Sequence, residues 1–224
     1  MVLAPGDTHG AWVAMVTGGA TRIGVETIQH LVDRGFAVVV GYLHDQRAAE
    51  AVVEQVLARH GAAVAIRADA TDDVDVERLF GEAIEVFGKI DILVHWVGGL
   101  SAALGSSDLD AVELEGLWRN EAHGAFLVNR EAARRLGPGG AIVNVAGTFG
   151  SAATGVDVHS RTTWLHALMH ELDQDLHERG VTINAVWVDT DDLGAPGRIA
   201  DVIVSLTCDD GEPVTGQVFR LDDR

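Results

Sequence analysis

Short apolar runs alternate along this chain with longer segments in which apolar residues recur at helical spacing. The first run, from Trp12 to Val16, is followed by a glycine turn and then by a helical pattern from about Arg22 to Arg34. The run FAVVVGYL at 36–43 is continuous and β-branched, which is typical of a parallel strand buried on both faces. The whole pattern predicts seven strands, at 12–16, 36–43, 62–69, 90–97, 141–146, 181–188 and 217–221.

Helices are predicted between these strands, at 22–34, 46–60, 72–87, 108–136, 155–178 and 199–207. Gly61 and Gly88 are expected to end the second and third of them. This regular order predicts an α/β fold, a Rossmann-like, doubly wound, mostly parallel sheet with helices on both faces. Because no repeat, low-complexity tract or linker divides the chain, we expect one domain over residues 1–224, with 1–10 as a flexible segment.

Composition then narrows the range of partners. The chain has 224 residues, 47% of them hydrophobic, which is enough for one sizeable core. A net charge of -18 makes a broad contact with nucleic acid phosphates or acidic lipid improbable. No apolar run reaches the ~18 residues that span a bilayer, and the first ten residues do not resemble a signal peptide. We therefore expect a cytoplasmic protein.

The glycine turn after the first strand is the clearest candidate for a binding site. Glycines there let backbone approach a phosphate, and the start of the following helix offers unpaired N–H groups to an anion. In doubly wound sheets ligands bind beyond the carboxyl ends of the strands, where this turn would lie. Such turns also occur where only tight packing is needed. The turn alone therefore leaves open whether it binds a phosphate or only packs tightly.

Several separated motifs are similar to those of the short-chain dehydrogenase/reductase family. Residues 17–24, TGGATRIG, resemble its TGxxxGIG turn, with Arg22 in place of the middle glycine. IDILV at 90–94, GVTINAV at 180–186 and VTGQVFRLDD at 214–223 match other parts of the family pattern, so the likeness covers nearly the whole chain. The resemblance implies an oxidoreductase that binds a nicotinamide dinucleotide, and a cofactor-binding set of Thr17, Gly18, Thr21, Arg22, Ile23, Gly24, His44, Asp69, Ala70 and Gly98.

The departures from the family pattern concern catalysis. The NNAG motif is replaced by HWVG at 95–98, and the bulky Trp96 is expected to crowd the nicotinamide side. At the place of the catalytic serine stand Ala146 and Gly147, with Thr148 as the nearest hydroxyl. The resemblance places the YxxxK pair at Val158 and Thr162, or, one residue later, at His159 and Thr163. Neither alignment restores the tyrosine and lysine.

Carbonyl reduction needs a proton donor, and a phenol serves near neutral pH only when a cation lowers its pKa. His159 is the best surviving acid/base candidate because imidazole titrates near neutrality; the competing interpretation is a solvated histidine at a helix start. Asn120 falls at the family's helix-four asparagine, and it either takes part in proton transfer or satisfies backbone at a kink. Thr148 is the third catalytic candidate; the competing interpretation is that its hydroxyl only stabilises a turn.

Cofactor choice depends on the end of the second strand, where an acidic residue would favour NAD. Leu43-His44-Asp45 does not fit that pattern, while Arg22, His44 and Arg47 are suited to surround a 2′-phosphate. NADP(H) is therefore predicted, with NAD(H) left open, and no nucleotide binds if Arg22 and Trp96 close the cleft. No metal is expected, because the helix face with His166, His170, Asp173 and His177 lacks a metal-binding motif.

Three functions remain open from the sequence. The first is an atypical, Tyr-independent oxidoreductase or ketoreductase that acts on a small carbonyl compound with NADP(H). The second is a catalytically inactive family member that serves as a binding or scaffold subunit. The third is cofactor-free isomerisation or dehydration by His95 or His159. The resemblance also implies a homodimer or homotetramer formed through the helices after strands four and five.

Overall fold

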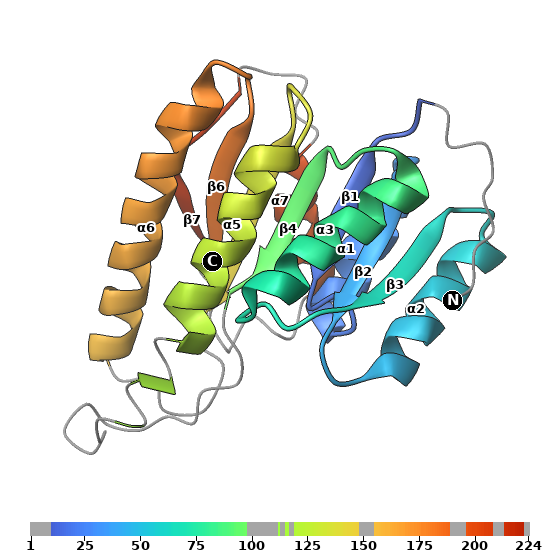
Figure 1. The fold of residues 1–224 in the computed structure, drawn as a ribbon, viewed down its shortest axis with the longest axis horizontal. Coiled ribbons are helices and arrows are strands. Elements are labelled where there is room, and N and C mark those ends of the chain that lie inside the picture. Colours follow the sequence, from blue (N-terminus) through green and yellow to red (C-terminus); the bar gives the residue numbers. More distant parts are fainter. Residues whose placement is uncertain are drawn as a thin grey trace.

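The fold was analysed in a computed structural model that describes residues 10–97, 112, 115–116, 119–147, 155–188, 196–207 and 213–221, with the side chains of 120 and 155–162 left out. These residues form a seven-stranded sheet in the order β3-β2-β1-β4-β5-β6-β7, and every neighbouring pair is parallel (Figure 1). The strands are β1 (Val13–Thr17), β2 (Ala37–Tyr42), β3 (Ala63–Arg67), β4 (Ile92–Trp96), β5 (Ala141–Gly147), β6 (Thr182–Val188) and β7 (Val218–Leu221).

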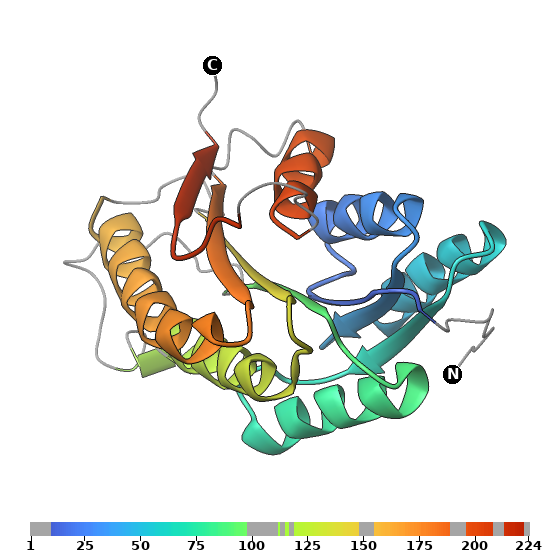
Figure 2. The ribbon, with the colours of Figure 1, turned by 90° about the horizontal axis from the view of Figure 1, so that it is seen from above.

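Helices cover both faces of this sheet, as seen from above in Figure 2. One face carries α3 (Asp73–Phe87), α5 (Gly124–Arg135) and α6 (Gly155–His177). The other carries α1 (Arg22–Asp33), α2 (Gln46–Ala58) and α7 (Pro196–Ser205), with α1 packed against α7. The predicted doubly wound α/β fold in a single domain is confirmed.

Two apolar cores lie on either side of the sheet, and this explains the continuous apolar runs. In β1, Val13 and Met15 belong to the core under α3 and α5, whereas Ala14 and Val16 belong to the core under α1 and α2. Successive side chains of a strand point to opposite faces, so a strand covered on both sides is apolar at every position. All four of these side chains are almost fully buried.

The switch point of the sheet lies between β1 and β4. From β1 the chain moves outward through β2 to β3, then returns to place β4 on the other side of β1. The register pairs Thr17 with Gly41 and Val16 with Val94. The turns that follow β1, β2 and β4 therefore meet at one edge of the sheet, where a crevice for ligands is expected.

Most predicted boundaries hold within a few residues, and the end of α2 differs for a physical reason. Gly88 ends α3 with a left-handed φ of 81°, as predicted, but α2 ends earlier, and the left-handed residue is His60 with φ of 60° rather than Gly61. Gly61 is needed for space, because a Cβ there would lie 2.7 Å from Val56 Cγ1. The helix predicted at 108–136 is described only in part: a π-helical turn at Arg119–His123 precedes α5.

Across the described ranges, no helix has the length and apolarity needed to traverse a lipid bilayer.

Candidate functional site

The turn between β1 and α1 leaves no room for a side chain at Gly24 and holds Gly18 in a conformation that favours glycine. Gly18 has a left-handed φ of 66°, and the hydroxyl of Thr21 caps α1 by accepting the Gly24 N–H at 3.1 Å. A Cβ on Gly24 would lie 2.5 Å from the Gly18 carbonyl oxygen, because the first turn of α1 packs directly against the loop. The backbone N–H groups at the start of α1 are thereby brought to the edge of the sheet, where an anion can approach them.

A cavity of about 810 Å³ opens beside this turn at the carboxyl ends of the first four strands. It falls within the size range of small-molecule and cofactor sites. Its wall contains most of the predicted cofactor residues: Thr17, Gly18, Thr21, Arg22, Ile23, His44, Asp69 and Ala70. Gly24 supports the turn without lining the cavity, and Gly98 lies outside the described residues.

The cavity wall also includes side chains that the sequence did not single out. Leu79 comes from α3 and Val128 from α5, while Tyr42 ends β2 and Thr71 lies in the loop after β3. Leu79 and Val128 are buried members of the core under α3 and α5. They form an apolar surface next to the polar loop ends, which suits a ligand with a flat ring and several polar groups. Their helical spacing marks them only as core residues, so no signal in the sequence distinguishes them.

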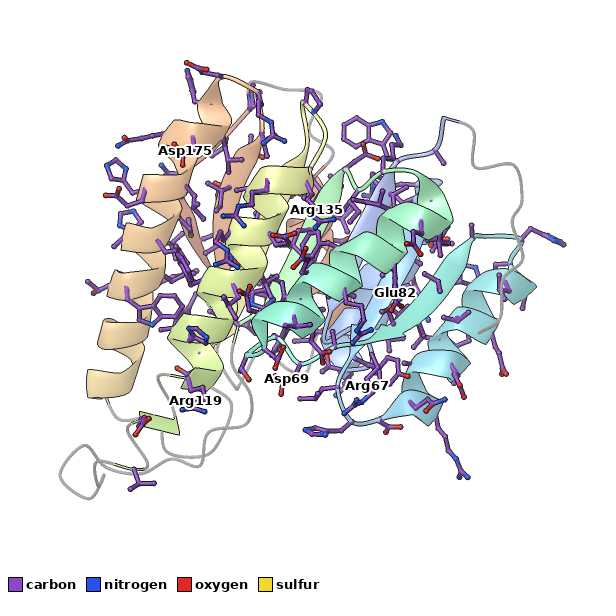
Figure 3. The ribbon with its side chains drawn as sticks, viewed as in Figure 1. Arg67, Asp69, Glu82, Arg119, Arg135 and Asp175 are labelled. Carbon is purple, nitrogen blue, oxygen red and sulfur yellow. The ribbon has the colours of Figure 1, made fainter. Side chains whose placement is uncertain are left out.

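Cationic groups gather where β2 and β3 end. Arg22 is exposed on the cavity wall and forms no ion pair with any described residue. Arg67, at the end of β3, donates from Nε to the Leu43 carbonyl at 3.1 Å and so stands next to the end of β2. Figure 3 shows Arg67 and Asp69 at the edge of the sheet where β3 ends. Arg47, which the sequence grouped with Arg22, is exposed on α2 and does not line the cavity.

Two carboxylates on the wall are partly engaged by the protein itself. Asp45 caps α2, because its Oδ1 accepts the Ala48 N–H at 2.9 Å. Asp69 Oδ1 accepts both the N–H and the hydroxyl of Thr71, at 2.9 and 2.8 Å. The Asp45 bond holds the start of α2, the Asp69 bonds hold the loop after β3, and the second oxygen of each carboxylate stays available to a ligand.

A hydrogen bond from the loop after β3 to α3 also holds this loop in place. The Asp69 N–H donates to Asp75 Oδ2 at 3.0 Å, and Asp75 pairs with Arg78 at 2.7 Å. The hydrogen bond from Arg78, followed by that from the Asp69 backbone, lowers the pKa of Asp75. The loop after β3 therefore keeps a charged anchor at neutral pH.

His95 and Trp96, at the end of β4, are joined to the glycine turn through one hydroxyl. Thr17 Oγ1 accepts the Trp96 N–H at 3.1 Å and lies 2.7 Å from His95 Nδ1. His95 is 2% exposed, its Nε2 has no hydrogen-bond partner among the described atoms, and burial lowers its pKa to about 3. The imidazole is therefore neutral at physiological pH and does not serve as a cationic general acid, which weakens the cofactor-free hypothesis at this residue.

The predicted catalytic positions fall at the end of β5, near the start of α6 and in the π-helical turn. Ala146 and Gly147, at the serine place, are buried in β5 and bring no hydroxyl; Thr148 lies outside the described residues. Asn120 belongs to the π-helical turn, and His159 follows the start of α6 by four residues, but neither side chain is described. The π-helical turn is the kind of kink that the backbone interpretation of Asn120 requires.

The histidines of α6 do not form a metal site in the part of the chain that is described. His166, His170 and His177 are exposed, while Asp173 accepts a hydrogen bond from the Thr215 hydroxyl at 2.5 Å. No group of three potential metal ligands occurs among the described side chains. Asp173 therefore ties α6 to the loop before β7.

Comparison with known proteins agrees with this geometry. The family of short chain dehydrogenases matches residues 12–190. This chain belongs to that family. The match begins at β1 and runs through β6, so it includes the glycine turn, the cavity wall and the expected catalytic positions.

Three members of the short chain dehydrogenase family illustrate the likeness. The chain is 32% identical to versicolorin reductase 1 of Aspergillus parasiticus, over 84% of this chain and 69% of that protein. It is 28% identical to a probable tetrahydroxynaphthalene reductase of Zymoseptoria tritici, over 94% and 92% of the two chains. Among solved structures, a short chain dehydrogenase of Burkholderia cenocepacia in complex with NADP is 26% identical, with a TM-score of 0.82 over 93% of this chain and 95% of the other.

Proposed function

We propose that this protein is an NADP(H)-dependent oxidoreductase that interconverts a small carbonyl compound and its alcohol. The observation that carries the proposal is the cavity beside the β1–α1 turn, which has Arg22 and His44 on its wall and Arg67 next to the end of β2. A dinucleotide fits this place because the turn brings glycine backbone to the phosphate position without a Cβ in the way. When bound, NADPH supplies a hydride to the carbonyl carbon.

The cationic wall supports NADP(H) over NAD(H). Arg22 has no acidic partner among the described residues, and Asp45, the acid nearest the end of β2, already caps α2. A guanidinium without a partner binds a 2′-phosphate through charge-assisted hydrogen bonds. The Burkholderia cenocepacia relative, in complex with NADP, gives the same choice further support. The relatives named as reductases support an oxidoreductase and give no support to an inactive subunit.

The proton for the alcohol oxygen must come from a group other than the family's tyrosine. We assign this role to His159, which lies in α6 and borders in sequence the place of that tyrosine, with Thr148 and Asn120 as the other catalytic candidates from the sequence. An imidazole near neutrality is matched to proton transfer at physiological pH. Tetrahydroxynaphthalene and versicolorin are the first substrates to test, because two of the relatives are named as reductases of these compounds.

The binding test compares NADP+ and NAD+ by calorimetry on the wild type, Arg22→Ala and Arg47→Ala. Loss of one phosphate contact is expected to weaken NADP+ binding about tenfold in Arg22→Ala, with NAD+ nearly unchanged. Arg47→Ala is the matched control, since Arg47 is also exposed but lies off the cavity wall. Equal affinity of the wild type for both nucleotides would contradict the NADP(H) assignment.

The turnover test follows NADPH oxidation across a panel of ketones. Replacing His159 by Ala is expected to lower kcat by about 10²-fold, while His166→Ala, an exposed histidine of the same helix, leaves kcat unchanged. If folded wild type that binds NADPH turns over no ketone, the oxidoreductase proposal fails. Unchanged kcat in His159→Ala removes the role given to that residue.

A further inference from the structure

Arg67 lies beside the end of β2, at the rim of the cavity (Figure 3). It is the last residue of β3 and pairs with Tyr42 of β2, and its exposed side chain donates from Nε to the Leu43 carbonyl at 3.1 Å. Arg67 itself is not part of the cavity wall, but Leu43 and Ala68, the residue after Arg67, both are. In doubly wound folds the 2′ position of the adenosine ribose is bound near this strand end.

The main chain of Arg67 is held by hydrogen bonds from two directions. The Ala68 N–H donates to the Tyr42 carbonyl at 2.9 Å, and the Arg67 carbonyl accepts Arg78 Nη2 at 2.8 Å. Arg78 is itself held by the Asp75 carboxylate at 2.7 Å. Together with the bond from Nε, these contacts set the position of the guanidinium before any ligand binds, and a preorganised group loses less conformational freedom on binding.

The far end of the Arg67 guanidinium has no partner among the described residues. It forms no ion pair with any of them, and Nε is its one side-chain donor that reaches a described acceptor. The charge of Arg67 contributes to the lowered pKa of Asp75, but the Asp75 carboxylate is bonded to Arg78 and to the Asp69 N–H. With Nε engaged, Nη1 and Nη2 still form a fork of N–H groups that matches two oxygens of a phosphate.

Arg22 and Arg67 come to this rim from different elements, Arg22 from the start of α1 on the cavity wall and Arg67 from the end of β3. Two guanidinium groups match the charge of a phosphate monoester, which is close to -2 at neutral pH. Asp45 lies on the same wall, and its negative charge opposes an anion there. A second cation is therefore needed more than on a wall without a carboxylate.

We propose that Arg67 is a specificity-determining residue that holds the 2′-phosphate of NADP(H) together with Arg22. This inference rests on the proposed function, because it assumes that the cavity binds NADP(H). The fork of Arg67 is used by a phosphate monoester and stays unused by the 2′-hydroxyl of NAD(H). Removing the fork therefore weakens only the binding of ligands that carry the 2′-phosphate.

Arg67→Gln tests this role by calorimetry with two probes, adenosine 2′,5′-bisphosphate and adenosine 5′-monophosphate. The Gln Nε2 is as many bonds from the main chain as the Arg Nε, so it keeps a donor for the Leu43 carbonyl while the fork is removed. We expect the bisphosphate to bind about tenfold weaker than to the wild type, with the monophosphate unchanged. Arg34→Gln is the matched control, because Arg34 is an exposed arginine that also donates to one main-chain carbonyl, at the end of α1 away from the cavity.

The wild type tests the proposed function separately from the role of Arg67. We expect it to bind the bisphosphate about tenfold tighter than the monophosphate, or more. If it does not, the NADP(H) assignment fails, and the role of Arg67 with it. If the wild type shows this preference and Arg67→Gln retains it in full, only the role of Arg67 is overturned. Equal weakening of both probes in Arg67→Gln, or a loss of the same size in Arg34→Gln, also overturns that role, because Arg67 then acts through the loop structure or through net charge alone.

Discussion

One hydroxyl, that of Thr17, joins the glycine turn to the end of β4. It accepts the Trp96 N–H and lies within hydrogen-bond distance of His95 Nδ1, so a substitution that removes it takes one hydrogen-bond partner from each of these groups. The three residues come from strands separated by about eighty positions in the sequence. Their contact depends on the register between β1 and β4, which no local pattern specifies.

Burial of His95 makes the stability of the protein depend on pH. Its pKa falls from 6.5 to about 3 on folding, so only the unfolded chain takes up this proton between those values. The stabilising contribution is present above pH 6.5 and is lost as pH falls toward 3. Between pH 7 and pH 5 we expect the wild type to lose about 2 kcal/mol more unfolding free energy than His95→Asn.

Urea unfolding at the two pH values measures this difference. His166→Asn is the control, because His166 is exposed on α6, and it should follow the wild type. A wild type and a His95→Asn variant that lose equal stability would show that His95 is hydrated or charged in the folded protein.

At the scale of elements, the packing of α1 on the turn makes Gly24 irreplaceable. A Cβ there meets backbone at 2.5 to 3.0 Å, and backbone, unlike the end of a flexible side chain, has no other place to go. Gly24→Ala is expected to destabilise the protein by about 1–3 kcal/mol and to weaken NADPH binding by displacing the turn.

Gly81→Ala provides the matched control for this substitution. Gly81 lies within α3, and nothing approaches a Cβ at that position within 4 Å. The change should raise stability by about 0.5–1 kcal/mol through helix propensity alone. Chemical denaturation and calorimetry on both variants make the test, and a Gly24→Ala protein with wild-type affinity would show that the turn adapts.

The sequence predicted the elements well because each strand is buried on both faces and each helix is amphipathic. It misplaced the end of α2, since His60 takes a left-handed conformation that is usually expected of glycine. The glycine turn and the ends of the predicted strands, both recognisable in the sequence, were enough to identify most of the polar residues of the cavity wall. The sequence did not identify Leu79 and Val128, because a core side chain that borders a cavity follows the same helical spacing as one that does not.

At the scale of the whole molecule, α5 and α6 lie side by side on one face of the sheet (Figures 1 and 2). The helices after strands four and five remain the predicted surface for a homo-oligomer. Phe126 on α5 is 43% exposed, with the Arg130 guanidinium 5.6 Å from its ring. An exposed aromatic beside an arginine is the kind of pair that interfaces bury.

We predict that Phe126→Ser shifts the protein toward monomer, measured by light scattering across a concentration series. The control is Val74→Ser on α3, since Val74 is 73% exposed and lies on another helix. If Phe126→Ser has the same mass as the wild type at every concentration, the contact between copies does not use this part of α5.

Lys89 offers a site for attaching the protein covalently to a surface. It is the one lysine in the sequence, it pairs with Asp91 at 2.9 Å, and its ammonium lies 5.9 Å from the Trp12 ring. It precedes β4, so it sits at the amino ends of the strands, opposite the edge that holds the cavity. An amine-reactive linker at this side chain would tether the protein to a sensor surface with its cleft facing the solution.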